Sequence, residues 1–126
     1  MLCLAVPKLP DCPEWQLELK LDGYRGIGIR SQGRAHLASR NGKNFSERFP
    51  TVTRALDRLP DETVIDGEIV AANEDGLSSF ILLQNFGAPN TRPCSYAFDS
   101  LILVGTDLLS LLEQRRTLLR HLIPTV

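Results

Sequence analysis

The sequence predicts an α+β fold. Apolar residues alternate with polar ones at period two in several short segments, which is typical of strands, and recur at helical spacing in others. The chain has 126 residues, 43% of them hydrophobic, which is enough for the core of one domain. Its 14 basic and 15 acidic residues nearly cancel, so the overall charge gives no sign of a nucleic-acid-binding surface.

The first predicted elements form a hairpin after an irregular start. Residues 1–14 contain three prolines, which lack the amide donor that a central strand or helix requires. Apolar and polar residues then alternate from Trp15 to Leu21, so a strand is expected with Glu18 and Lys20 on its polar face. Asp22-Gly23 is a turn signal, and it predicts a tight connection to a second strand that contains Tyr24, Ile27 and Ile29.

The middle of the chain predicts a strand, a turn, a helix and another strand. Residues 35–39 form a short strand candidate, and residues 40–43 are typical of a turn. Phe49, Val52, Leu56 and Leu59 have helical spacing, with Pro50 suited to the first turn and Pro60 ending the run. The strand that follows, residues 64–72, has Asp66 and Glu68 on one face and Ile65 and Ile69 on the other.

Three further elements complete the expected fold. A short helix is predicted over residues 80–86, a loop over 89–93 and a strand over 96–104. An amphipathic helix is predicted from Leu108 to Leu122, and four leucines are expected to pack it on the sheet: Leu111, Leu112, Leu118 and Leu119.

The sequence also predicts where in the cell the protein is found. No apolar stretch approaches the length of a membrane span, and residues 1–10 lack the layout of a secretory signal. We therefore expect a cytoplasmic protein with no membrane partner. The three cysteines, Cys3, Cys12 and Cys94, are odd in number and widely spaced, which favours free thiols over a disulfide framework or a zinc site.

The most informative segment is Lys20-Leu21-Asp22-Gly23-Tyr24-Arg25, which fits the pattern Lys-x-Asp-Gly-x-Arg. A lysine amine can attack the α-phosphorus of ATP and hold AMP as a phosphoramidate. The glycine lets the backbone come close to a bound nucleotide, and the arginine offers planar donors to ribose or phosphate oxygens. The simpler interpretation is a surface lysine beside a hairpin turn.

The segment resembles the lysine motif of the covalent nucleotidyltransferases, which comprise DNA ligases, RNA ligases and capping enzymes. Three further segments follow in the order of the ligase family. Ser39-Arg40-Asn41-Gly42 before Phe49-Pro50 resembles the ligase segment that precedes a Phe-Pro helix start, and Asp66-Gly67-Glu68 resembles the third motif. Tyr96-Ala97-Phe98-Asp99 resembles the next one, whose aromatic ring stacks on adenine. The chain is thus similar to ATP-dependent DNA ligases, especially the ligase modules of end-joining enzymes.

The resemblance implies an antiparallel-rich nucleotidyltransferase (ATP-grasp-like) fold and a role for each motif residue. The cofactors would be ATP and Mg²⁺, and the partner nicked double-stranded DNA in repair, recombination or replication. The roles are AMP attachment at Lys20, adenine binding by Glu18 and Phe98, ribose binding by Arg25, ribose or metal binding by Glu68, and nucleotide or DNA contact by Arg40.

The resemblance also leaves expectations and alternatives open. The family's later Glu-Gly and Lys-x-Lys motifs and its oligonucleotide-binding (OB-fold) domain have no match, so residues 1–126 are expected to be a partial adenylation domain, incomplete at its C-terminal side. Such a chain should form little lysine-bound AMP by itself. The alternatives are an RNA ligase, a capping-type guanylyltransferase, or a catalytically silent nucleotide-binding module. The sequence does not indicate the oligomeric state.

Overall fold

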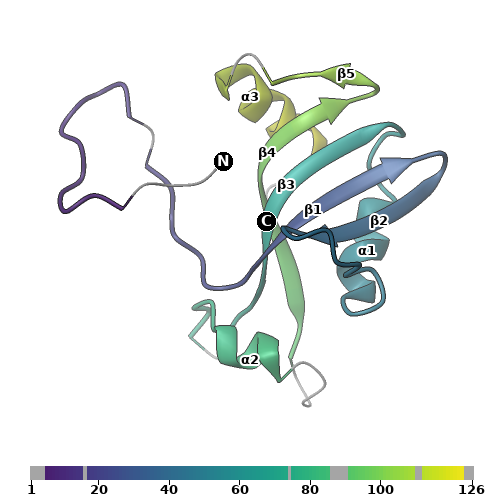
Figure 1. Cartoon of the computed structure of the whole chain (residues 1–126), viewed down its shortest axis with the longest axis horizontal. Helices are drawn as coiled ribbons and strands as arrows, with labels where there is room; N and C mark the ends of the chain where they lie inside the picture. Colours follow the sequence, from purple (N-terminus) through teal and green to yellow (C-terminus); the bar gives the residue numbers. More distant parts are fainter. Residues whose placement is uncertain (1–4, 16, 74, 86–90, 110–111, 124–126) are drawn as a thin grey trace.

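The computed structural model describes residues 5–15, 17–73, 75–85, 91–109 and 112–123. Within them the chain forms a five-stranded antiparallel sheet in the order β2-β1-β3-β4-β5, accompanied by helices (Figure 1). This confirms the predicted α+β class. The strands are β1 (Tyr24–Ser31), β2 (Arg34–Ser39), β3 (Thr63–Ala71), β4 (Pro93–Leu103) and β5 (Thr106–Asp107), and the helices are α1 (Pro50–Leu56), α2 (Phe80–Gln84) and α3 (Leu112–Leu122).

The first hairpin joins β1 to β2 through Gln32 and Gly33. Both residues have positive φ, 50° and 72°, and Ser31 pairs with Arg34 across the loop. Two consecutive positive φ angles are typical of the type I′ turn, whose twist matches that of the strands it joins. The strands predicted around Tyr24–Ile29 and at residues 35–39 are confirmed.

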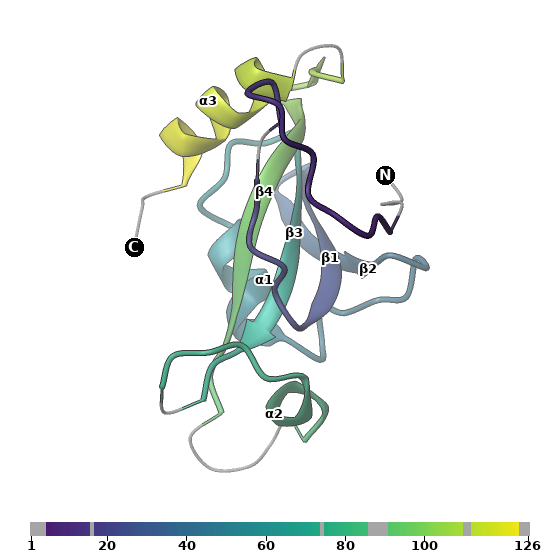
Figure 2. The ribbon, with the colours of Figure 1, turned by 90° about the vertical axis from the view of Figure 1, so that its left-hand side faces the viewer.

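The predicted strand from Trp15 to Leu21 is wrong, and so is the hairpin turn at Asp22-Gly23. Residues 17–22 are irregular, and Leu17 and Leu19 are 70% and 90% exposed. β1 already pairs with β2 on one side and β3 on the other, so it has no free edge onto which a preceding strand could fold. Figure 2 shows this N-terminal segment running past the sheet towards α3.

One face of the sheet carries the hydrophobic core. The predicted central helix is confirmed as α1, with Pro50 at its start, and it packs on this face. Proline suits the first turn of a helix because its missing amide donor would have no partner there. Side chains from α1, the strands and the preceding loop are buried together, namely Leu37, Phe45, Phe49, Val52, Leu56, Ile65 and Ile69.

β3 separates this core from a polar face. Ile65 and Ile69 point into the core, while Asp66 and Glu68 occupy the alternate positions, as the sequence predicts. β4 pairs with β3 along most of its length, but the register shifts between Asp66 and Gly67. The polar face of β3 and the strands beside it form the candidate site.

The last two predicted helices are present with altered limits. α2 confirms the short helix at residue 80, and Phe86 lies outside the described residues. α3 begins at Leu112 rather than Leu108, and Leu111 also lies outside the described residues. Leu119 is buried, Leu118 is half-buried and Leu112 is 42% exposed, so Leu119 anchors the helix instead of the four leucines together.

The structure also shows the state of two cysteines and the length and polarity of the helices. Cys12 and Cys94 are free thiols, as expected, and both are exposed, while Cys3 lies outside the described residues. In the described part of the chain, every helix is too short or too polar to cross a membrane.

Candidate nucleotide-binding site

The candidate site is built around Arg25, near the start of β1. Arg25 lies opposite Glu68 in the β1–β3 pairing, and its guanidinium reaches diagonally to Asp66. Nε donates to Oδ1 at 3.0 Å and Nη2 donates to Oδ2, which gives a two-pronged ion pair. Asp66 is only 4% exposed, so this buried carboxylate holds the arginine in a defined orientation.

Phe98 reaches the same guanidinium because β4 contains a bulge. Asp66 pairs with Asp99 and Gly67 pairs with Ala97, which leaves Phe98 as an extra residue without a partner on β3. A bulge breaks the strict alternation of faces and re-aims the side chain it carries. The Phe98 ring centroid lies 5.6 Å from Arg25 Cζ, so the bulge brings this ring to the guanidinium that Asp66 holds.

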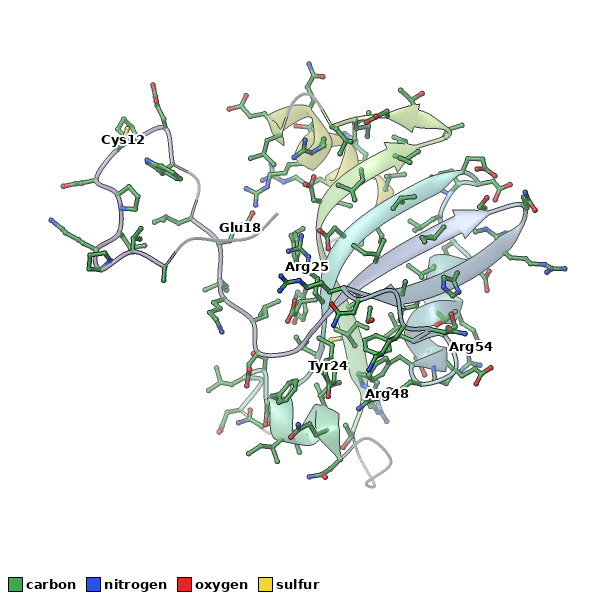
Figure 3. All side chains as sticks on the ribbon, in the orientation of Figure 1. Cys12, Glu18, Tyr24, Arg25, Arg48 and Arg54 are labelled. Atoms are coloured by element: carbon green, nitrogen blue, oxygen red, sulfur yellow. The ribbon has the colours of Figure 1, made fainter. Side chains whose placement is uncertain are left out.

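A first pocket, with a volume of 360 Å³, lies between the N-terminal segment, β4 and α3. Glu18 and Phe98 both line it, so the structure brings together the two residues expected to hold adenine. Leu19, Leu21 and Leu119 supply apolar walls. Glu18, on the N-terminal segment (Figure 3), forms an ion pair with Arg116 of α3, which orients its carboxylate at the pocket wall.

A second pocket of 620 Å³ adjoins Arg25 on the side of the β2–α1 connection. Arg25, Arg40 and Glu68 line it together, so three of the predicted nucleotide contacts share one cavity. Burial raises the pKa of Glu68 above its ordinary value, although the charges of Arg25 and Lys20 act in the opposite direction. A cavity with this lining can accept hydroxyl and phosphate oxygens.

Lys20 lies on the irregular segment that leads into β1, and its side chain is exposed. It lines neither pocket, but its charge acts on Glu68, one of the residues lining the second pocket. Lys20, the predicted nucleophile, is therefore close enough to the second pocket for its charge to lower the pKa of Glu68 against the larger effect of burial. It is positioned by the chain between Glu18 and Arg25 and not by a strand, contrary to the sequence prediction.

Asp22 and Gly23 have structural roles that sequence reasoning missed. The amide of Asp22 donates to Ser78 Oγ at 3.0 Å, and its carboxylate accepts from the amide of Phe80, at the start of α2, at 3.2 Å. A side chain at Gly23 would place Cβ 2.1 Å from the carbonyl oxygen of Ile69. Gly23 is thus required by close packing on β3, and it also lines the second pocket, so the expected approach to a nucleotide stays a prediction.

A second arginine–aspartate pair attaches α3 beside the site. Arg115 Nε and Nη2 donate to the carboxylate of Asp99 at 2.8 and 3.1 Å, and Nη1 donates to the carbonyl of Leu109 at 2.9 Å. Asp99 is the cross-strand neighbour of Asp66, so the two ion pairs lie side by side. The consecutive Arg115 and Arg116 were visible in the sequence, but their partners lie far away along the chain.

The carboxylates of the described residues do not form a protein-only metal cage, since no three metal-ligating side chains cluster among them. Mg²⁺ commonly takes one or two carboxylates and completes its coordination with water and substrate phosphates. Asp66 is occupied by Arg25, so Glu68 is the carboxylate that fits such a role here.

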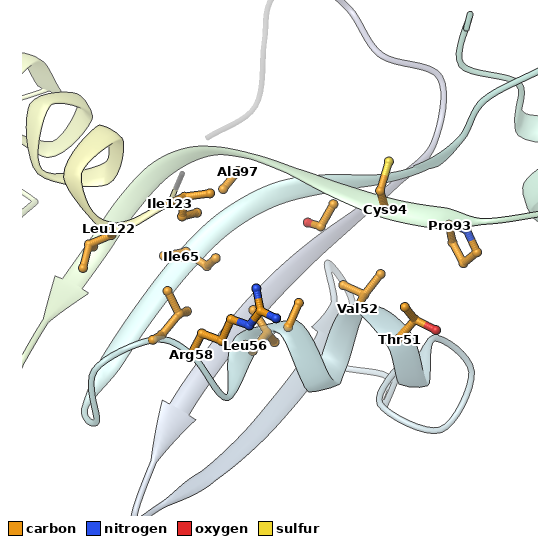
Figure 4. Close-up of a pocket in the computed structure, with 13 residues that line it drawn as sticks. Thr51, Val52, Leu56, Arg58, Ile65, Pro93, Cys94, Ala97, Leu122 and Ile123 are labelled. Carbon is orange, nitrogen blue, oxygen red and sulfur yellow. The ribbon is translucent and has the colours of Figure 1, made fainter. Parts of the chain in front are cut away.

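An apolar pocket lies on the other face of the sheet. It has a volume of 330 Å³ and lies between α1, β3, β4 and the end of α3, with Ile65 and Cys94 in its wall (Figure 4). None of the residues predicted to bind nucleotide lines this pocket. Arg58 is the one charged side chain of its largely apolar lining, whereas the second pocket is lined by several arginines and a lysine, so we place the candidate site on the polar face.

Comparison with known proteins identifies the class of protein to which this fold belongs. The model of the family described as ATP dependent DNA ligase domain matches residues 6–126, and the chain belongs to this family. The multifunctional non-homologous end joining protein LigD of Pseudomonas aeruginosa is 38% identical over 118 residues, which are 90% of this chain and 14% of that protein. DNA ligase C of Mycobacterium tuberculosis is 33% identical over 85% of this chain and 32% of its own length.

Comparison with solved structures also identifies DNA ligases as similar proteins. A mycobacterial DNA ligase D complexed with ATP and MES has a TM-score of 0.75 and 36% identity, covering 83% of this chain and 35% of that one. The ligase domain of M. tuberculosis LigD also has a TM-score of 0.75 and 36% identity. The chain therefore spans about a third of these domains and a smaller part of the LigD proteins.

Proposed function

We propose that this chain supplies the nucleotide-binding part of an ATP-dependent DNA ligase that seals nicks through a lysyl-AMP intermediate. The observation that carries the proposal is the placement of Glu18 and Phe98 in one pocket, beside Arg25 and Glu68 in the next. Adenine would stack on Phe98, with its polar edge near Glu18. Arg25 and Glu68 would meet the ribose, and Arg40 the nucleotide or DNA.

The proposed reaction begins at Lys20. Its neutral amine attacks the α-phosphorus of ATP, a P–N bond forms, the P–O bond to the β-phosphate breaks, and pyrophosphate leaves while the amine proton passes to solvent. The AMP then moves to the 5′-phosphate at a nick, where the P–N bond is replaced by a P–O bond. Attack by the 3′-hydroxyl finally forms the phosphodiester and releases AMP. Mg²⁺, when bound beside Glu68, would offset the phosphate charge.

A chimera tests this proposal. Residues 6–126 replace the matching segment in the ligase domain of Pseudomonas aeruginosa LigD, and the protein is incubated with α-labelled ATP and Mg²⁺. We expect protein-bound label that disappears in Lys20→Ala and persists in Lys8→Ala, a matched control because Lys8 is exposed and lies outside both pockets. Undiminished label in Lys20→Ala would remove Lys20 from its proposed role.

The same chimera separates the alternatives. Labelling by GTP in place of ATP would indicate a capping-type guanylyltransferase, and sealing of nicked RNA but not nicked DNA would indicate an RNA ligase. The match to a DNA ligase family favours ATP and nicked DNA. The relatives named for end joining favour a role in DNA repair, while recombination and a cytoplasmic location stay predictions.

A further inference from the structure

Arg48 is held over a cluster of aromatic rings that the nucleotide assignment does not use. Its Cζ lies 5.0 Å from the centroid of Tyr24, 5.3 Å from Phe49 and 5.9 Å from Phe45. Phe45 and Phe49 are 8% and 0% exposed and pack edge-on at 5.4 Å, while Phe80 packs on the Tyr24 ring at 4.9 Å. The guanidinium therefore lies on a platform that the core itself makes rigid.

The same guanidinium lines the second pocket, where positive charge is in excess. Arg25, Arg40, Lys43 and Arg48 face Glu68 as the one carboxylate of the lining, and Arg25 is already paired with Asp66. Within the described residues, Arg40, Lys43 and Arg48 have no ion-pair partner. This combination leaves three cations without a carboxylate partner in the described part of the chain.

The loop that carries two of these cations has a defined shape. Ser39 Oγ accepts from the amide of Lys43 at 3.0 Å, and the Ser39 amide donates to the Lys43 carbonyl at 2.8 Å. The amide of Gly42 donates to the Ser39 carbonyl at 2.9 Å. Arg40 and Lys43 thus project from a hydrogen-bonded turn, next to an arginine fixed by stacking.

We propose that Arg48, together with Arg40 and Lys43, forms a phosphate-binding subsite separate from the pocket of Glu18 and Phe98. A guanidinium stacked on aromatic rings keeps its planar set of N–H donors free at the edge, which suits two-pronged binding of phosphate oxygens. The inference rests on the proposed function, since the phosphate would come either from ATP or from the backbone of a DNA strand. Both sources present the same chemistry to the pocket.

Binding measurements on the 126-residue chain test the subsite. ATP without metal and a nicked duplex with a 5′-phosphate are titrated separately against wild type, Arg48→Ala, Arg48→Lys and Arg54→Ala. Arg54 is a matched control because it is an exposed arginine on α1 that lies outside the pocket (Figure 3). For at least one ligand we expect Arg48→Ala to bind about tenfold more weakly, or about 1.4 kcal/mol, and Arg54→Ala to match wild type.

Two further readouts distinguish phosphate binding from damage to the fold. Arg48→Lys keeps the charge but not the planar donors, so its affinity should fall between wild type and Arg48→Ala. For the duplex, the slope of log K against log salt should become shallower by about 0.9 for each phosphate that the variant no longer neutralises. Thermal melting of each variant sets a temperature at which all are folded, and the titrations are made there.

The outcomes show whether the bound phosphate comes from DNA or from ATP, and whether the subsite or the proposed ligase activity is wrong. Weakening for the duplex alone assigns the phosphate to DNA, and weakening for ATP alone assigns it to the triphosphate. If Arg48→Ala matches Arg54→Ala in both titrations, or if wild type binds neither ligand, the subsite is wrong. Arg48-dependent binding without Lys20-dependent labelling of the chimera would overturn the proposed ligase activity alone, and the reverse result would overturn the subsite alone.

Discussion

At the scale of single residues, the candidate site depends on side chains that neighbouring carboxylates and bulges orient. Asp66 holds Arg25 through two hydrogen bonds, and the β4 bulge brings Phe98 to the same guanidinium. The buried aspartate leaves the arginine few alternative orientations, so a nucleotide would meet a site that is largely organised before binding.

Phe98 is the residue whose proposed role is simplest to measure. Phe98→Leu keeps much of the apolar volume but removes the flat ring, and loss of a base stack costs about 1–3 kcal/mol. We therefore expect ATP to bind this variant roughly ten- to a hundredfold more weakly, since each 1.4 kcal/mol is tenfold. Phe98→Tyr should retain most of the affinity in the same titration. Equal affinity for Phe98→Leu and wild type would exclude stacking of adenine at this residue.

Glu68 makes the stability of the fold depend on pH. Its folded-state pKa is raised above the ordinary value of 4.5, mainly by burial. Protonated Glu68 therefore stabilises the folded state, and this contribution is fully present below the unfolded-state pKa and is lost as pH rises through the folded-state pKa. Glu68→Gln should consequently gain stability relative to wild type as pH rises through that window.

Urea unfolding of both proteins at several pH values checks this expectation. The difference in free energy of unfolding between Glu68→Gln and wild type should grow from acid to neutral pH. A difference that is constant across pH would show that the attraction of Arg25 and Lys20 balances the effect of burial on the pKa of Glu68, and a difference that shrinks would show that it outweighs burial.

At the scale of secondary-structure elements, α3 is attached to β4 by one buried leucine and one buried arginine. Leu119 and Arg115 are both 7% exposed, and Arg115 is paired with Asp99. The sequence pattern predicted that several leucines of this helix pack on the sheet and did not distinguish among them. The structure assigns the anchoring role to Leu119 because only one narrow stripe of a short helix faces β4.

Substitutions in α3 should therefore have unequal effects. Leu119→Ala is expected to lower the free energy of unfolding by about 2–4 kcal/mol, since it removes a buried side chain. Leu118→Ala should cost about 1 kcal/mol or less, because Leu118 is half-buried and lines an open surface pocket. Denaturant unfolding gives both values, and equal losses would show that the helix packs differently.

At the scale of the whole molecule, the sheet has one face packed by α1 and another that carries the site. The chain spans about a third of the solved LigD ligase domain. Phosphoryl transfer requires positive groups around the developing phosphate charge, and removal of one such group costs about 10²–10³ in rate. We expect the isolated chain to form lysyl-AMP at least about a hundredfold more slowly than the chimera. Equal labelling rates would show that these 126 residues are sufficient for adenylylation.

The sequence by itself determined the family, the class of fold and most element positions. Each family motif is a short run of neighbouring residues, and the motifs follow one another in a known order, so the sequence alone reveals them. The placement of Asp66 and Glu68 on one face depends only on the alternation of side chains along a single strand. The same reasoning failed for Trp15–Leu21, because a period-two pattern describes side chains and does not show whether the backbone finds a partner strand.

Only the tertiary structure decided which distant residues meet. The pairing of Glu18 with Arg116, the stacking of Arg48 on Tyr24 and the bulge that turns Phe98 depend on contacts between elements far apart in the chain. Gly23 gives the clearest case, since its small size serves the approach to the Ile69 carbonyl on β3. Such contacts leave no periodic signal in the sequence, because they arise from strand order and register and not from local conformational preference.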